Sequence, residues 1–192
     1  MFGGDSYRYL SLEDAAERLS MHSGTYVPGL LQTRGYIEAI VAFGQKHEST
    51  GHREHFVKTR LKRQAILTRR NPLALDAIFL ESALRAVVGG PEVTRAQLRH
   101  MVACSRQPNI RVRVIPFSAG APSVDATLFT IIDFPGADHR SVLSQARATG
   151  DDLQDNPAEV RRVRRMFTDA ASHAVCEKAT VRRIEEIEKE LT

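Results

Sequence analysis

Apolar and polar residues follow two different periods along this chain. In some stretches apolar residues recur every three or four positions, which is typical of helices that bury one side. In others they alternate with polar residues or run continuously, which is typical of strands. The helical stretches are 11–19, 34–44, 52–70, 91–102, 157–174 and 181–191, and the strand-like stretches are 73–80, 110–115, 127–134 and 141–146. We therefore expect an α/β (α+β) fold, in which a small mixed or antiparallel sheet of about four strands is flanked by helices, with helices at the C-terminus.

Several of these helices have recognisable start signals. Ser11 is the expected cap of the first helix, Thr33 of the second, and Asn156 with Pro157 forms the clearest helix start in the chain. The basic stretch 52–70 is expected to be one long helix that buries a single side. The buried side is expected to hold Phe56, Val57, Leu61, Ala65 and Leu67.

Length and composition indicate one domain, residues 1–192. The chain has 192 residues, of which 42% are hydrophobic, and this is enough to bury a sizeable core. No stretch approaches the roughly 18 apolar residues of a membrane span, and the first residues lack a signal-peptide pattern. Cys104 and Cys176 are far apart, which favours buried or incidental thiols in a reducing compartment over a disulfide. We expect a cytoplasmic protein without membrane contact.

The positive charge raises the question of nucleic-acid binding, because the net charge is +4 and arginines gather in two helices. However, 23 acidic residues nearly balance 27 basic ones, aromatic residues that could stack on bases are few, and no recognition helix is evident. We favour solvated or internally paired charges and do not expect direct sequence-specific DNA binding, although a non-specific contact with the DNA backbone stays open. The basic residues concerned are Arg53, Lys58, Lys62, Arg69 and Arg70 in one helix, and Arg161, Arg162, Arg164 and Arg165 in the other.

Three histidines, His47, His52 and His55, lie close together in the sequence beside Glu48 and invite a metal hypothesis. The five-residue step from His47 to His52 points their imidazoles about 140° apart in a helix, whereas a zinc-protease motif needs a four-residue step. We interpret them as solvated surface residues. No phosphate-binding loop or nucleophile motif is evident either, so we expect no metal, no cofactor and no catalytic residue.

The residue types of the segment 27–33 indicate its local conformation. Pro28-Gly29 is typical of a type II turn, because proline fixes the first central φ and glycine accepts the positive second φ. Leu30 and Leu31 would anchor the turn in the core, and Gln32 leads to the helix cap at Thr33.

Further landmarks follow this turn in a fixed order. They are Val27–Thr33 (VPGLLQT), Arg60–Gln64 (R-x-x-R-Q), Glu81–Gly90 (E-x-x-L-R-x-x-V-G-G), Gln97-Leu98 and the strand from Ile110 to Pro116. Together they resemble an actinobacterial domain of unknown function that usually lies behind an N-terminal helix-turn-helix in XRE-type, antitoxin-like transcriptional regulators. The strand near Ser144 departs from the family pattern, which has an aromatic and an acidic residue there. The stretch before Val27 is too short for a helix-turn-helix, so we expect no DNA-binding domain.

The resemblance implies a regulatory sensor or interaction domain that acts by binding without turnover. Its implied target is a small-molecule effector or a small acidic partner protein, and we expect a homodimer. Two alternatives stay open. The first alternative is a free-standing enzyme of specialised metabolism that uses the effector pocket for chemistry. The second is a decoy subunit that forms heterodimers with full-length regulators.

The candidate binding residues combine polar groups with apolar surroundings. They are Pro28, Gly29, Leu30, Gln32, Arg60, Arg63, Gln64 and Glu81. One interpretation is an arginine-to-Glu81 clamp that ties a helix to the sheet, since a bidentate pair offsets desolvation. The other is a polar wall for a small anionic ligand or an acidic side chain of a partner. Our hypothesis is that binding at the turn shifts an equilibrium between two arrangements of the domain.

Overall fold

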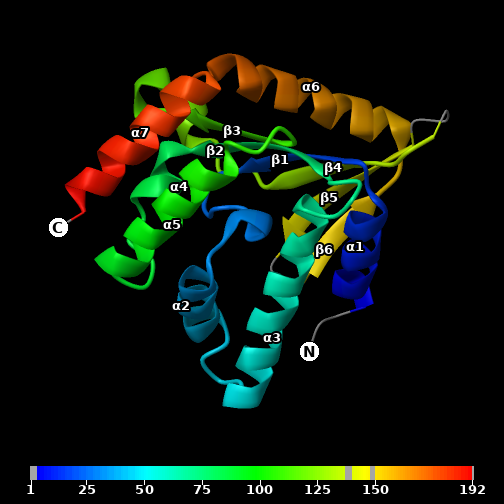
Figure 1. Ribbon diagram of the computed structural model, residues 1–192. Coiled ribbons are helices and arrows are strands. Elements are labelled where there is room, and N and C mark those ends of the chain that lie inside the picture. The colour runs from blue at the N-terminus through cyan, green and yellow to red at the C-terminus, as the bar shows by residue number, and fades with distance from the viewer. Residues whose placement is uncertain (1–3, 137–139, 148–149, 192) are drawn as a thin grey trace.

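The computed structural model describes residues 4–136, 140–147 and 150–191, and its centre is a twisted mixed sheet (Figure 1). Within these residues the sheet has six strands, namely β1 (Arg18–Ser23), β2 (Ala74–Leu80), β3 (Ile110–Ile115), β4 (Phe129–Asp133), β5 (Ser141–Arg147) and β6 (Gly150–Gln154). The α-helices are α1 (Gly4–Ala15), α2 (Arg34–Gly44), α3 (Thr50–Arg63), α4 (Glu81–Arg85), α5 (Pro91–Cys104), α6 (Pro157–His173) and α7 (Glu177–Glu190). Short 3-10 turns are η1 (Gly29–Leu31), η2 (Gln64–Leu67), η3 (Phe117–Ala119) and η4 (Ala121–Val124).

The sheet has a parallel half and an antiparallel half that meet at β1. The strand order is β3-β2-β1-β4-β5-β6. Strands β1, β2 and β3 are parallel and are joined by helical crossovers, as parallel strands require. Strands β4, β5 and β6 follow as an antiparallel meander, with β4 paired to β1. The first strand in the chain is therefore central in the sheet.

Helices cover both faces of the sheet. Helix α6 lies along one face, above the sheet in Figure 1, and buries Val160, Val163 and Phe167 against Ile78 of β2 and Ile131 of β4. On the opposite face, α5 and α7 cover the parallel half, and α1 packs near β6. Helices α2 and α3 form a hairpin with a small apolar cluster of their own. The two larger clusters account for most of the buried core.

The expected fold class is confirmed, but the expected number of strands was too low. The four predicted strands are present as β2, β3, β4 and β5, and β1 and β6 were missed. The pattern of apolar residues did not predict strand β1, because its buried positions include the polar residues Ser20 and His22, which are 5% and 3% exposed. The Nδ1 atom of His22 lies 2.8 Å from the carbonyl oxygen of Thr127, and the ring stacks on Phe129, so its partners come from far along the chain. Strand β6, with the sequence GDDLQ, has little strand propensity of its own and is held by pairing with β5.

Three predicted helices have different limits in the structure, and the last of them, expected from residue 181, begins at Glu177. The first runs from Gly4 to Ala15, so Ser11 lies inside it and is not its cap. The long basic helix ends at Arg63 and continues as the 3-10 turn η2. Because the period shortens from 3.6 to 3.0 residues at this point, Ile66 is buried where Ala65 was expected, and Ala65 is exposed.

The predicted helix starts at Thr33 and Asn156 are confirmed. The Thr33 hydroxyl accepts a hydrogen bond from the Tyr36 N–H, and the Asn156 side chain accepts one from Ala158 N–H. Among the described helices, none combines the length and the apolar character needed to cross a membrane.

Candidate functional site

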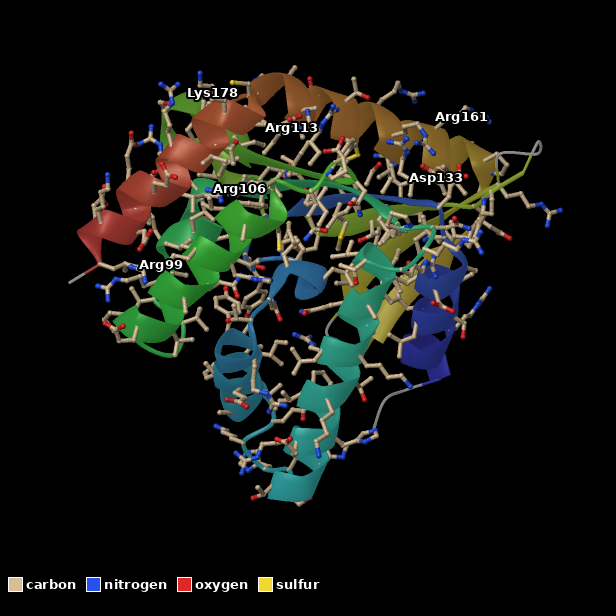
Figure 2. The ribbon with its side chains drawn as sticks, viewed as in Figure 1. Arg99, Arg106, Arg113, Asp133, Arg161 and Lys178 are labelled. Carbon is tan, nitrogen blue, oxygen red and sulfur yellow. The ribbon has the colours of Figure 1, made fainter. Side chains whose placement is uncertain are left out.

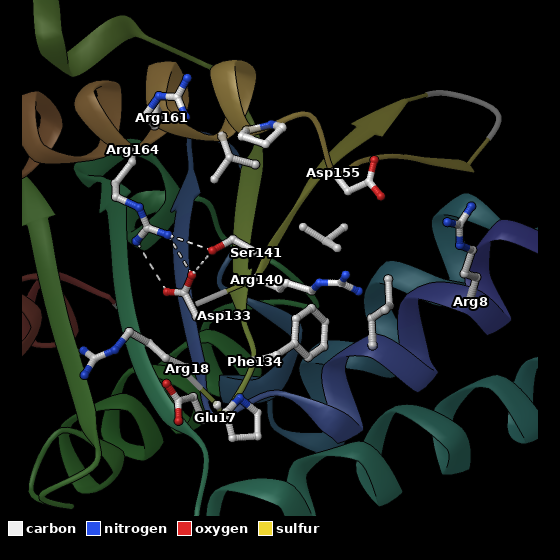
Figure 3. Close-up of a pocket in the computed structure, with 16 residues that line it drawn as sticks. Arg8, Glu17, Arg18, Asp133, Phe134, Arg140, Ser141, Asp155, Arg161 and Arg164 are labelled. Atoms are coloured by element: carbon white, nitrogen blue, oxygen red, sulfur yellow. Dashed lines mark hydrogen bonds and ion pairs between the residues drawn. The ribbon is translucent and has the colours of Figure 1, made fainter. Parts of the chain in front are cut away.

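A broad, open cleft of about 1250 Å³ lies at one end of the sheet, beside the turn between β4 and β5 (Figure 3). Its walls come from α1, the start of β1, the ends of β4 and β5 that meet at this turn, and the first turns of α6. These segments are far apart in the sequence. The pairing of β1 with β4, in which Arg18 is opposite Asp133, brings them together.

Positive charge dominates the part of the cleft lining that the structure describes, because it holds five arginines and three carboxylates. Four of the arginines, Arg8, Arg18, Arg140 and Arg161, are exposed and form no ion pair with any carboxylate in the part of the chain that the structure describes. The fifth, Arg164, is paired. The four guanidinium groups are therefore available to an anion that enters the cleft.

One of the three carboxylates, that of Asp133, is already neutralised within the protein. The Nη2 atom of Arg164 donates a hydrogen bond of 2.7 Å to its Oδ1 atom, and the Ser141 hydroxyl donates one of 2.6 Å to the same oxygen. Asp133 lies beneath α6, and Arg161 projects from that helix (Figure 2). Glu17 and Asp155 supply the remaining negative charge, and both are exposed.

The floor of the cleft is partly apolar. Leu12, Phe134, Val142 and Val160 contribute side chains to it. Histidine, cysteine and lysine are missing from its described lining, and Ser141 is hydrogen-bonded to Asp133 and Arg164. An apolar floor with an arginine rim is an arrangement that recognises anionic groups.

The segment 27–33 is a different kind of feature, since most of it is buried. Leu30 is 3% exposed, Leu31 0% and Gln32 3%. Gly29 begins the 3-10 turn η1, in which the Leu31 N–H donates to the Pro28 carbonyl at 2.8 Å. The predicted type II turn is therefore wrong, because Gly29 is not among the glycines with a positive φ.

Three glutamine side chains satisfy the backbone of this buried segment, and we call Gln32, Gln64 and Gln97 the glutamine network. Gln32 Nε2 donates to the Val27 carbonyl at 2.7 Å, and Gln64 Nε2 donates to the carbonyls of residues 29 and 32. Gln97 Nε2 donates to the Leu31 carbonyl at 2.7 Å, while its Oε1 accepts from the Thr33 N–H at 2.7 Å. A buried irregular segment needs such partners, because it has no helix or sheet ladder to supply them.

Two arginines lie beside the glutamine network, and one has a charged partner while the other has a neutral one. Arg63 binds Glu13 of α1 through a bidentate pair, with Nε to Oε2 at 3.0 Å and Nη2 to Oε1 at 2.7 Å. The expected clamp from α3 to Glu81 is therefore wrong, because the carboxylate partner of Arg63 is Glu13 and the pair joins α3 to α1 instead of to the sheet. Arg60 Nη1 donates to Gln32 Oε1 at 3.0 Å. Burial, with added repulsion from Arg63, lowers the pKa of Arg60 to about 10.

Glu81 opens the short helix α4 and is 3% exposed. Its Oε1 accepts from Arg85 Nε at 2.7 Å, and its Oε2 accepts from the Phe117 N–H at 3.0 Å. Burial opposes ionisation of this carboxyl, but the hydrogen bonds from Arg85 and Phe117 and the charge of Arg183 outweigh it, so its pKa lies below the ordinary value. Glu81 therefore ties the end of β2 to η3 and is separate from the glutamine network.

The remaining sequence candidates lie at the surface or in the core. His47, His52 and His55 are exposed or partly exposed, and no group of three potential metal ligands comes together within the described ranges. Cys104 is buried, which raises the pKa of its thiol, whereas Cys176 is exposed. Both are free cysteines.

Comparison with known proteins gives one match. The model of a family described as a domain of unknown function (DUF5753) matches residues 7–186. The chain belongs to this family. No curated protein and no solved structure matches the chain.

The cleft of this DUF5753 domain was not found from its sequence, although two of its arginines were singled out. Arg161 and Arg164 were noted as part of a basic helix, whereas Arg8, Arg18 and Arg140 are isolated in the sequence. Several other noted charges are paired, including Lys58 with Glu54, Arg162 with Glu159 and Arg69 with Asp14. Only the three-dimensional arrangement separates the paired arginines from the four available ones.

Proposed function

We propose that this DUF5753 domain is a regulatory binding domain, related to the sensor domains of XRE-type regulators, which holds an anionic ligand in its cleft without chemical turnover. The observation that carries the proposal is the group of four exposed arginines, Arg8, Arg18, Arg140 and Arg161, that line one cleft without carboxylate partners among the described residues. Two kinds of ligand suit such a cleft, a small anionic effector and an acidic segment of a small partner protein.

Electrostatics supports an anionic ligand. Like charges that share a concave surface repel one another, and an anion that enters removes this repulsion while it accepts hydrogen bonds from several guanidinium forks. The apolar side chains of Leu12 and Phe134 on the floor would add contact area beside the charged groups.

The position of the cleft supports a regulatory role. Arg8 belongs to α1, the first described helix, whereas Arg161 belongs to α6, which follows the last strand of the sheet. A ligand that contacts both would favour arrangements in which α1 and α6 are held together at the sheet. It would shift the equilibrium only by the difference between its affinities for the two arrangements.

A titration with matched charge variants tests the proposal. Citrate stands for a small effector and poly-glutamate for an acidic partner segment, and binding is measured by calorimetry. The test variant is Arg140→Gln combined with Arg161→Gln. The control is Arg165→Gln, which removes an exposed arginine from the same helix but outside the cleft.

We expect at least one probe to bind the wild type and to lose about tenfold in affinity, or ~1.4 kcal/mol, in the double variant. The Arg165→Gln variant is expected to bind as the wild type does. Equal affinity of all three proteins would refute the proposal, and so would failure of both probes to bind the wild type.

Native mass spectrometry of the protein purified from its own cells complements this titration. A bound anion or small acidic protein that is lost from the double variant supports the proposal. Release of a chemically altered species during incubation would instead indicate an enzyme.

A further inference from the structure

A second anion site is indicated at Arg60, which is not among the residues that line the cleft. Arg60 lies on α3 and is partly buried. Its guanidinium group donates one hydrogen bond, from Nη1 to Gln32 Oε1, and lies 4.9 Å from the centre of the Phe56 ring. Within the described structure it has no carboxylate partner.

Other partly buried arginines of this chain differ from Arg60 in this respect. Arg63 pairs with Glu13, Arg85 with Glu81, and Arg113 with Asp76. Partial burial of a guanidinium group without a counter-charge is unfavourable, and the neighbouring positive charge of Arg63 adds repulsion. The fold therefore holds the charge of Arg60 in a place where an anion would be stabilised.

The free edge of Arg60 defines the chemistry of that anion. Because Nη1 binds Gln32, the edge formed by Nε and Nη2 has no hydrogen-bond partner among the described residues. This is the same edge that Arg63 uses for its bidentate pair with Glu13. A guanidinium edge of this kind matches two oxygens of a carboxylate or a phosphate group.

The glutamine network orients this edge in advance. Gln32 Oε1 accepts from Arg60, and Gln32 Nε2 is fixed on the Val27 carbonyl, so the amide cannot turn away without losing a second bond. The Phe56 ring lies near the guanidinium group. A guanidinium group that is already oriented loses less conformational entropy on binding.

We infer that Arg60 is the anchor of a second binding site, in which its Nε–Nη2 edge binds the carboxylate or phosphate group of a small molecule beside η1. The inference does not depend on the cleft. In this inference the segment 27–33 also orients Arg60 for binding, through the hydrogen bond between Arg60 and Gln32.

The first test follows the wild-type protein by NMR. Inorganic phosphate and acetate are the two probes, and the Nε–Hε resonance of each arginine is followed at constant ionic strength. We expect the Arg60 resonance to shift saturably with at least one probe. The Arg63 resonance, held on Glu13, is the internal control and is expected to stay in place.

The second test uses variants. Arg60→Gln removes the charge and the bidentate edge, Arg60→Lys keeps the charge but loses that edge, and Lys62→Gln, which removes an exposed charge from the same helix outside the cleft, is the control. We expect the affinity for the bound probe to fall about tenfold or more in Arg60→Gln and by a smaller factor in Arg60→Lys, with little change in Lys62→Gln.

Several results would overturn the inference. They are the absence of any saturable shift at Arg60, equal shifts at Arg60 and Arg63, and wild-type affinity in Arg60→Gln. An equal loss of affinity in Lys62→Gln would indicate a general effect of the helix charge instead of a site at Arg60. A shift with phosphate alone identifies a phosphate ligand and a shift with acetate alone a carboxylate ligand, and either supports the site.

Discussion

At the scale of single residues, long polar side chains replace the regular backbone ladder where the chain is buried but irregular. Gln32, Gln64 and Gln97 come from three segments that are far apart in the sequence, yet all of them bond within residues 27–33. A glutamine amide both donates and accepts, so a single side chain can satisfy an N–H and a C=O group. The stability of this region therefore depends on these amides as well as on the burial of Leu30 and Leu31.

Replacement of Gln97 by leucine is expected to destabilise the protein by about 2–3 kcal/mol. The change leaves the Leu31 carbonyl and the Thr33 N–H without their partner, and buried groups without partners are costly. Urea unfolding followed by circular dichroism measures the loss. The control is Gln107→Leu, because no described residue hydrogen-bonds with the Gln107 side chain, and a change within about 0.5 kcal/mol is expected there. Equal losses in both variants would contradict the role assigned to Gln97.

Glu81 is expected to make the stability depend on pH. Because its pKa is lower in the folded than in the unfolded protein, its contribution is present above its ordinary value of 4.5 and is lost as the pH falls through the folded value. Glu81→Gln should therefore be less stable than the wild type at neutral pH, by about 1–3 kcal/mol. The difference should shrink as the pH falls below this ordinary value and through the lower folded one. Urea unfolding of both proteins across this range is the measurement, and a difference independent of pH would contradict the expectation.

At the scale of elements, capping residues and apolar periodicity indicate where helices form, whereas contacts with other elements determine the conformation of the connections between them. The residues before α5 are an example. Gly89 and Gly90 both have a positive φ, and a Cβ atom on Gly89 would lie 2.8 Å from the Cβ of Ala39 in α2. Glycine is needed at position 89 for the backbone conformation and for the close approach of α2.

Gly89→Ala is accordingly expected to cost about 2 kcal/mol, through the strained φ and the displacement of Ala39. Gly44→Ala is the matched control, because Gly44 ends α2 and a Cβ atom there meets no other atom within 4 Å. That change is expected to be neutral or to stabilise the protein by about 0.5 kcal/mol. Thermal unfolding of both variants gives the comparison, and similar melting temperatures for the two would contradict it.

At the scale of the whole molecule, the strand order decides where charge collects. Placing β4 beside β1 brings the β4–β5 turn to the start of β1, and α1 and α6 close around the same end of the sheet. Arginines from these separate segments then share the cleft. A net charge of +4 is small, so this local concentration has more influence on binding than the total charge.

Salt is expected to stabilise the protein by screening this cleft. At low ionic strength the four available arginines repel one another, and the repulsion fades as the screening length falls to about 8 Å at physiological salt. Arg140→Gln combined with Arg161→Gln should therefore melt a few degrees higher than the wild type at low salt, by about 1–3 °C, and equally at high salt. Scanning calorimetry at two sodium chloride concentrations measures this. A gain that is the same at both concentrations would point to a cause other than charge repulsion.

The sequence by itself determined the local elements with strong signals. The period of apolar residues located β2 to β5, and caps such as Thr33 and Asn156 located the starts of helices, because these depend on neighbours within a turn or two. It also identified Gln32, Arg60, Arg63 and Gln64 as polar groups in an apolar setting. It predicted Glu81 as the carboxylate partner of these arginines, whereas Arg63 pairs with Glu13.

The tertiary structure decided everything that depends on partners distant in the chain. It made β1 a central strand, because His22 finds Thr127 and Phe129 and the strand gains two neighbours. It paired Arg63 with Glu13 and left the Nε–Nη2 edge of Arg60 without a carboxylate partner. This difference depends on which side chains meet across the fold. The cleft arginines are likewise unremarkable in the sequence, since an ion pair or its absence is a matter of a few ångströms in space and not of spacing along the chain.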